Sequence, residues 1–255
     1  MTYDPMDWKP SPEPEGERHG MTEIVLVGTV HRDPKGYGKL VSILNEERPD
    51  SITLEMSPHA VRFRRGKGRI LISRVFEIMK EIKKENPRFA FYDPADHPAI
   101  RHVVAILDFP YEYQAAAAVS QSMGIPFRCI DRSDFSREKL SRLEGELVTE
   151  GNLRKLLDLD AVEFHEGVRR EYGLAAMALR APGIFNSFSD RSEMIARDQH
   201  AARKIRRIAE KSRCRKLLHI AGWEHLVMAG SGESLCELLS DLSPRRRLLE
   251  ARMDL

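Results

Sequence analysis

The segment EIVLVGTVH, from Glu23 to His31, is a short apolar run rich in β-branched residues, and it ends in glycine and histidine. Such a run predicts a buried β-strand, and the glycine permits a tight turn where the strand ends. A second segment, KLLHIAGWEH, from Lys216 to His225, repeats this arrangement near the other end of the chain. Both segments place a histidine three residues after a glycine that follows directly on a predicted strand.

Three further segments predict strands: SITLEM from Ser51 to Met56, RFAFYD from Arg88 to Asp93, and IPFRCID from Ile125 to Asp131. Amphipathic stretches of helical period lie between the predicted strands. Alternation of this kind predicts an α/β fold with a mostly parallel sheet flanked by helices. Residues 136–186 carry little strand signal, so we expect a helical insertion there that caps the site.

Length and composition narrow the class of protein. The chain has 255 residues, which suits one α/β domain, predicted over residues 21–255. Residues 1–20 are rich in proline and acidic side chains, so they predict a disordered tail without the features of a signal peptide. The apolar runs are too short to span a membrane, and three cysteines form no even disulfide framework. We therefore expect a cytoplasmic protein with free thiols and no membrane partner.

Positive residues cluster at Arg62 to Arg69, between Arg197 and Lys216, and at Arg245 to Arg247. Aromatic residues for base stacking are not interleaved with them, so solvated helix faces are the favoured interpretation and nucleic acid is not an expected partner. The sequence leaves homo-oligomer formation open.

Polar residues follow all five predicted strands. They are His31, Glu55, Asp93, Asp131 and His225. In an open parallel sheet, ligands bind beyond the carboxyl ends of the strands, so these side chains are expected near one edge. Imidazole and carboxylate together suit a divalent transition metal, for which His31, Glu55 and His225 are the candidate ligands.

Each candidate also has a structural interpretation. His31 could hydrogen-bond a loop carbonyl, and His225 could be a core histidine. Asp93 and Asp131 could instead cap helices or form turns. Glu55 follows a strand that should be buried, where an unpaired carboxylate is costly, so a metal ion or an arginine partner is expected beside it.

A helix is predicted from about Arg191 to Lys211, after a capping signal formed by Asp190 and Glu193. Arg191 and Asp198 fall on its apolar face, together with Ile205. Arg191 could supply a fixed positive charge to a developing oxyanion, or it could form a structural ion pair.

The same residues resemble a known family. GTVHRD followed by LNEERPDSITLEMSP, then FPYEYQAAAAVSQSMGIPFRCIDRSD, and finally DRSEMIARDQHAARKI with KLLHIAGWEH resemble the ordered motifs of TraB/PrgY-like proteins, which group with Tiki and GumN proteins, erythromycin esterases and haem-binding ChaN proteins. Tiki members are metal-dependent peptidases, and their functional GxxH histidines, glutamate and arginine correspond by motif to His31, His225, Glu55 and Arg191. Tiki and GumN proteins are exported, and many TraB proteins have membrane segments, whereas this sequence predicts neither feature.

The expected function is therefore hydrolysis of a peptide or small-molecule acyl bond by water activated on Mn, Co or Zn. One alternative is an esterase-like mechanism without metal, in which a histidine acts as general base and Glu55 orients it. Another is a binding module for haem or a small anion.

Overall fold

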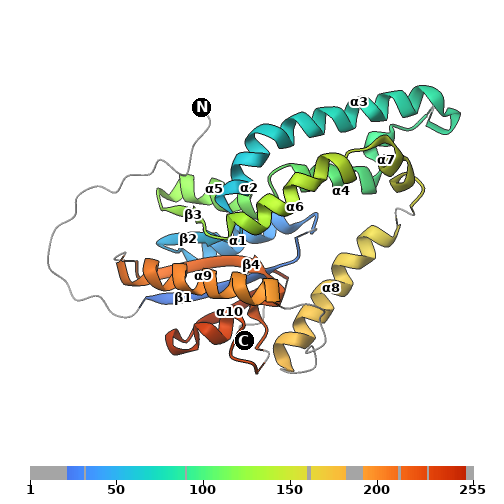
Figure 1. The fold of residues 1–255 in the computed structure, drawn as a ribbon. Coiled ribbons are helices and arrows are strands. Elements are labelled where there is room, and N and C mark those ends of the chain that lie inside the picture. The colour runs from blue at the N-terminus through green and yellow to red at the C-terminus, as the bar shows by residue number, and fades with distance from the viewer. Residues whose placement is uncertain are drawn as a thin grey trace. The chain divides into compact units, whose positions relative to one another are not determined.

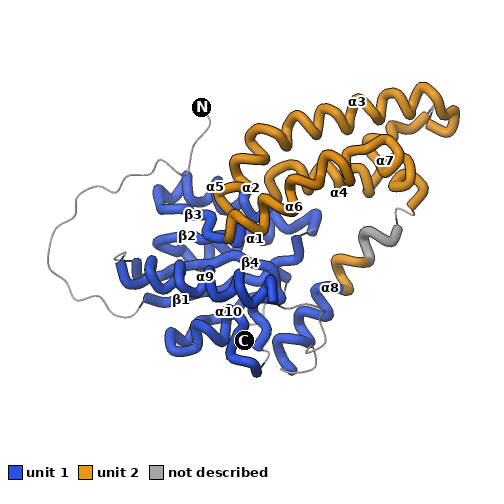
Figure 2. The backbone as a smooth tube through the Cα atoms, viewed as in Figure 1, with its two compact units in different colours: residues 1–56, 111–131, 171–255 blue, residues 57–110, 132–170 orange. Residues whose placement is uncertain are grey.

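The fold is taken from a computed structural model, which describes residues 22–31, 33–89, 91–159, 162–181, 192–211, 214–228 and 230–250, with the side chains of 162–166 excepted. The predicted tail, residues 1–20, lies outside these ranges. The described chain forms two compact units, shown in Figure 2. Unit 1 contains residues 1–56, 111–131 and 171–255, and unit 2 contains residues 57–110 and 132–170.

Unit 1 is built on a five-stranded parallel sheet (Figure 1). Its strands are β1 (Glu23–Thr29), β2 (Ser51–Leu54), β3 (Phe127–Cys129), β4 (Lys216–Gly222) and β5 (Arg245–Leu248). Their order across the sheet is β3-β2-β4-β1-β5. The α/β fold class with a parallel sheet is thus confirmed. The central strands are apolar and almost fully buried, as expected for a parallel sheet covered on both faces.

The register of the strands brings the two Gly-x-x-His segments together. Thr29 of β1 is paired with Gly222 of β4, so both strands end at the same level. Leu54 of β2 is paired with Ile220, and the next backbone N–H, that of Glu55, donates to the Ile220 carbonyl at 2.9 Å. The polar residues that follow these strands therefore meet at one edge of the sheet.

Helices complete unit 1 around the sheet. They are α1 (Gly36–Glu47), α5 (Tyr111–Met123), α9 (Ser192–Lys211), α10 (Leu235–Leu238) and the short 3₁₀ turns η4 (Trp223–Leu226) and η5 (Ser240–Leu242). The buried face of α9 carries Asp198, Ala201, Ala202 and Ile205, which confirms the predicted position of Asp198. No helix among the described residues is long and apolar enough to cross a membrane.

Unit 2 is helical. It contains α2 (Pro58–Phe63), the π-helix η1 (Arg64–Gly68), α3 (Arg69–Glu85), η2 (Pro87–Phe89), η3 (Pro94–Asp96), α4 (Pro98–Leu107), α6 (Ser133–Glu146) and α7 (Glu150–Leu156). The helix α8 (Val162–Arg180) begins in unit 2 and ends in unit 1. The helical character predicted for residues 136–186 is therefore found where that segment is described, although much of unit 2 comes from an earlier part of the chain.

Two strand predictions were wrong. Arg88 to Asp93 is not a strand, because Pro87–Phe89 forms a 3₁₀ turn and the described residues that follow are irregular. The second error is a strand that was not predicted: β5, whose residues RRRL are mostly charged. This edge strand is held by ion pairs instead, since Arg245 and Arg247 both contact the buried carboxylate of Glu47 at the end of α1.

Replacing Glu47 tests whether this cluster stabilises the fold. The Arg245 hydrogen bond, helped by Arg247 and Lys216, lowers the pKa of Glu47 to about 2 despite partial burial. A lowered pKa stabilises the folded state above the unfolded value near 4.5, and this stabilisation is lost as pH falls towards 2. At pH 7, Glu47→Gln should reduce the free energy of unfolding by about 2 kcal/mol, because Arg245 and Arg247 lose a shared buried partner and retain only their ion pairs with the more exposed Glu23 and Glu46.

The measurement is urea unfolding from pH 7 to pH 2, with Glu77→Gln, at an exposed position of α3, as the control. The difference between wild type and Glu47→Gln should shrink as pH falls below about 4.5. A difference that stays constant over this range would contradict the ion-pair explanation.

Candidate functional site

Glu55 lies at the centre of the polar cluster at the sheet edge. Its side chain is 8% exposed, and its Oε2 accepts a hydrogen bond from the Gly222 backbone N–H at 2.8 Å. Its Oε1 lies 3.0 Å from His225 Nε2 and also contacts the Arg197 guanidinium. Burial raises the pKa of Glu55, but the charges of His225 and Arg197 outweigh burial and hold the pKa well below its usual range. The arginine partner that the sequence required for Glu55 is therefore present.

Arg197 reaches this carboxylate from α9. Its guanidinium also forms a two-pronged contact with Asp131, with Nε 3.1 Å from Oδ1 and Nη2 2.7 Å from Oδ2. Planar contacts of this kind fix the direction of the guanidinium as well as its charge. Its remaining nitrogen, Nη1, makes no hydrogen bond with a described residue. Arg197 therefore connects the residues that follow β2 and β3. Its Nη1 nitrogen can still donate to another group.

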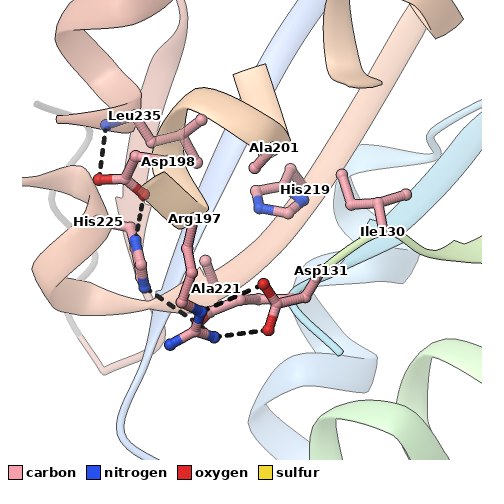
Figure 3. Close-up of a pocket in the computed structure, with 10 residues that line it drawn as sticks. Ile130, Asp131, Arg197, Asp198, Ala201, His219, Ala221, His225 and Leu235 are labelled. Atoms are coloured by element: carbon pink, nitrogen blue, oxygen red, sulfur yellow. Dashed lines mark hydrogen bonds and ion pairs between the residues drawn. The ribbon is translucent and has the colours of Figure 1, made fainter. Parts of the chain in front are cut away.

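His225 is held between two carboxylates. Its Nδ1 contacts Asp198 of α9 (Figure 3), while its Nε2 lies 3.0 Å from Glu55 Oε1. Asp198 is fixed in turn because its other oxygen accepts the Leu235 N–H at 3.1 Å. Burial lowers the pKa of His225, but Glu55 and Asp198 outweigh this effect and raise it well above its ordinary value.

His31 has a matching carboxylate partner. Its Nδ1 lies 2.8 Å from Oε1 of Glu112, a buried residue of α5, and that oxygen also accepts the Thr29 hydroxyl at 3.1 Å. Loss of water around the ring lowers the pKa of His31, but Glu112 more than compensates and raises it to about 9, although 59% of the side chain remains exposed. The ring orientation is thus set from Nδ1, which leaves Nε2 available.

Gly222 keeps a small space open between these groups. A Cβ atom at this position would lie 2.9 Å from Glu224 Oε2, 3.3 Å from His31 Nε2 and 3.7 Å from Glu55 Oε2. The backbone of Gly222 is extended, with φ −56° and ψ 144°, so a turn does not require glycine here. Glycine matters here because a side-chain carbon would crowd three polar side chains that approach this position closely.

A small cavity lies behind the Arg197 contacts (Figure 3). Its lining combines charged groups with small apolar side chains: Glu55, Ile130, Asp131, Arg197, Asp198, Ala201, His219, Ala221, His225 and Leu235. His219 of β4 is 1% exposed, and its Nδ1 lies 3.0 Å from the Thr53 hydroxyl. Burial lowers the pKa of His219 to about 4, so this ring is neutral at pH 7.

The structure brings together most residues predicted from the sequence. His31, Glu55, Asp131, Asp198 and His225 all belong to unit 1 and join the contacts described above. Asp93 does not follow a strand, so the reason for placing it at the sheet edge was wrong. It belongs to unit 2 and caps η3, where its carboxylate accepts the Ala95 N–H at 3.0 Å, as its alternative interpretation predicted. Arg191 lies outside the described residues.

Sequence reasoning missed four residues of the site: Glu112, Arg197, His219 and Glu224. Arg197 could have been found, because it stands one helical turn before the buried Ala201 and directly before Asp198. Glu224 stands inside the second Gly-x-x-His segment. Glu112 and His219 carry no spacing signal, since their contacts depend on how distant segments pack.

The site as it stands is internally paired. Among the residues that the structure describes, no three His, Cys, Asp or Glu side chains are positioned to hold a metal ion. In the described chain Glu55 contacts Arg197 and His225 instead. Comparisons with family models, curated proteins and solved structures found no match to this chain.

Replacing Arg197 by lysine tests the role of its planar contact. Lysine keeps the charge but cannot contact Glu55 and Asp131 with the same geometry. Arg197→Lys should therefore reduce the free energy of unfolding by about 1–3 kcal/mol, measured by urea denaturation. Arg203→Lys, at an exposed position of the same helix, is the matched control and should change little. Equal stability of the two variants would rule out a structural contribution from the contacts of the Arg197 guanidinium with Glu55 and Asp131.

Proposed function

We propose that this site binds a divalent metal ion and uses it to hydrolyse a peptide or ester acyl bond. The observation that carries the proposal is a pair of carboxylate-backed imidazoles. Glu112 holds His31 through Nδ1, and Asp198 holds His225 in the same way. Histidines that ligate metals commonly donate their second ring N–H to a carboxylate, which fixes the ring and raises its basicity.

The remaining donor atoms are close to one another. His225 Nε2 lies 3.0 Å from Glu55 Oε1, near enough for one ion with bonds of about 2 Å to contact both atoms. His31 Nε2 borders the space left open at Gly222, which Glu55 Oε2 also borders. His31, His225 and Glu55 would hold the ion, and imidazole with carboxylate suits Mn, Co or Zn. Binding would replace protons on the two imidazoles, so it would release them to the solvent.

A bound divalent ion would lower the pKa of a water molecule and polarise the acyl carbonyl. The residues of the chain have complementary tasks. Glu112 and Asp198 keep the two rings oriented, and Arg197 directs a fixed positive charge from its Asp131 anchor. The free Nη1 of Arg197 is the donor available to the negative charge that develops on the substrate oxygen. Arg197 thus takes the role that the sequence analysis gave to Arg191.

The raised pKa values weigh against the metal-free alternative. A general base must be unprotonated at the working pH. His31 has a pKa of about 9, and Glu55 and Asp198 raise the pKa of His225 far above its ordinary value. Without a metal, these shifts favour the protonated form of both rings at neutral pH. The motifs also resemble those of TraB/Tiki/GumN proteins, whose Tiki members are metal-dependent peptidases, and this resemblance supports the same proposal. We propose membership of that family as part of it.

Metal binding is the direct test. Equilibrium dialysis against Mn²⁺, Co²⁺ or Zn²⁺, followed by elemental analysis, should give one ion per chain. His31→Ala and His225→Ala should each weaken binding at least tenfold, since a lost ligand costs more than the 10- to 100-fold typical of a lost supporting partner. His200→Ala, on α9, is the control. Wild-type protein that binds none of these ions would exclude the metal proposal, and a Soret band on adding haem would favour the binding module.

Gly222→Ala tests the open space beside His31. The extended backbone at this position accepts alanine, and the closest atom, Glu224 Oε2, ends a flexible side chain that can move aside, so the melting temperature should change by no more than a few degrees. The added methyl group would occupy the space bordered by His31, Glu55 and Glu224, so metal affinity and hydrolysis of p-nitrophenyl acetate should both fall at least tenfold. Gly173→Ala, where a Cβ meets nothing within 4 Å, is the control. Unchanged affinity in Gly222→Ala would place the metal elsewhere.

A further inference from the structure

His219 carries a polar atom that the site described so far does not use. Its Nδ1 lies against Thr53, but its Nε2 is fully buried and has no hydrogen-bond partner among the described residues. The ring lies beside Ala201 and faces the cavity behind the Arg197 and Asp131 contact (Figure 3). A buried nitrogen without a partner destabilises a protein, because it loses its hydrogen bond to water on folding.

The cavity can satisfy that nitrogen. It offers a space of about 10 Å³, which is room for about one water molecule. Glu55, Asp131 and Asp198 are among its lining residues, and a carboxylate oxygen can accept more than one hydrogen bond, so these residues can supply acceptors to a molecule in the cavity. Internal waters typically make about three hydrogen bonds to buried polar groups, whereas a wholly apolar cavity of this size stays dry.

We propose that this cavity is an internal binding site for one water molecule, held by His219 and linking the Arg197–Asp131 pair with the His225–Asp198 pair. The chemistry of the lining sets the hydrogen directions. Ionised carboxylates only accept hydrogen bonds, so both hydrogens of the water point towards them. The water oxygen then accepts from Nε2–H of His219, and Nδ1 accepts from the Thr53 hydroxyl.

The low pKa of His219 agrees with this arrangement, because a neutral ring carries a single hydrogen, which the arrangement assigns to Nε2. The arrangement does not depend on a bound metal or on the proposed hydrolysis. It concerns groups that hold the Arg197 guanidinium and the His225 ring in place.

Filling the cavity in two backgrounds gives an experiment that separates a bound water from a dry space. Ala201→Val adds two methyl groups at the cavity wall, which crowds a space of this size in either case. If a water is bound, Val also displaces it and strands Nε2, so the melting temperature falls by several degrees more than crowding alone would cause. If the cavity is dry, the loss comes from crowding alone and does not depend on the residue at position 219. Ala105→Val, at an exposed position of α4, measures the helix-propensity cost of valine.

The same Ala201→Val substitution is then made in a His219→Leu variant. Leucine leaves no polar atom to strand, so Ala201→Val should lower the melting temperature less in this background than in the presence of His219. Equal losses of melting temperature in both backgrounds would overturn the proposal.

A measurement on the unmodified protein guards against variants that fail to fold. ¹⁵N NMR should show the His219 hydrogen on Nε2, and a high-resolution crystal structure should show one ordered water within hydrogen-bond distance of that atom. The Arg197 Nε–H resonance should shift in Ala201→Val and stay unchanged in Ala105→Val. A hydrogen on Nδ1, or clear density without a water, would contradict the arrangement.

Discussion

The structure of unit 1 depends on the buried negative charge of Glu55. A carboxylate at the end of a covered parallel strand must be neutralised, because its transfer from water is costly. Three separate parts of the chain supply the contacts: Arg197 from α9, His225 from η4, and the Gly222 N–H at the end of β4. The charge therefore fixes both the helix that lies over the sheet edge and the turn that follows β4. Substitution of Glu55 alone would leave two cationic groups facing each other.

The same constraint explains why the site contains two matching imidazole and carboxylate pairs. Each histidine follows a glycine at the end of a central strand, and the strands are paired in register from Glu23 to Thr29. Each ring is then oriented by an acid from a helix, Glu112 from α5 and Asp198 from α9. Four different elements thus position two Nε2 atoms near one carboxylate. The ion pairs hold these groups in place, and the metal ion that we propose would bind among them.

Much of this could be predicted from local sequence. Apolar strands followed by Gly-x-x-His predicted that His31 and His225 lie at the sheet edge. Glu55 follows a buried strand, so its carboxylate was expected to have a partner. Asp198 was assigned to the buried face of its helix by period alone, which α9 confirms.

Other features were not predictable in this way, since they depend on tertiary packing. Arg88 to Asp93 has strand-like residues, but Pro87–Phe89 forms a 3₁₀ turn. The charged RRRL segment forms a strand, because two of its arginines pair with Glu47. Arg197 was missed because its Cα is rotated about 100° from the predicted apolar stripe, and a long side chain reaches across that angle. Glu112 is far from His31 in sequence, and only the packing of α1 against α5 brings the two segments together.

The central claim is that the two imidazoles share one metal ion with Glu55. Anomalous X-ray diffraction from crystals soaked in Mn²⁺, Co²⁺ or Zn²⁺ tests it most directly, because the signal locates the ion independently of any substrate. The account predicts one anomalous peak within about 2.3 Å of Nε2 of both His31 and His225, with Asp198 and Glu112 still on the opposite nitrogens. A peak at another place, or no peak in crystals that retain the Arg197–Glu55 pair, would contradict it.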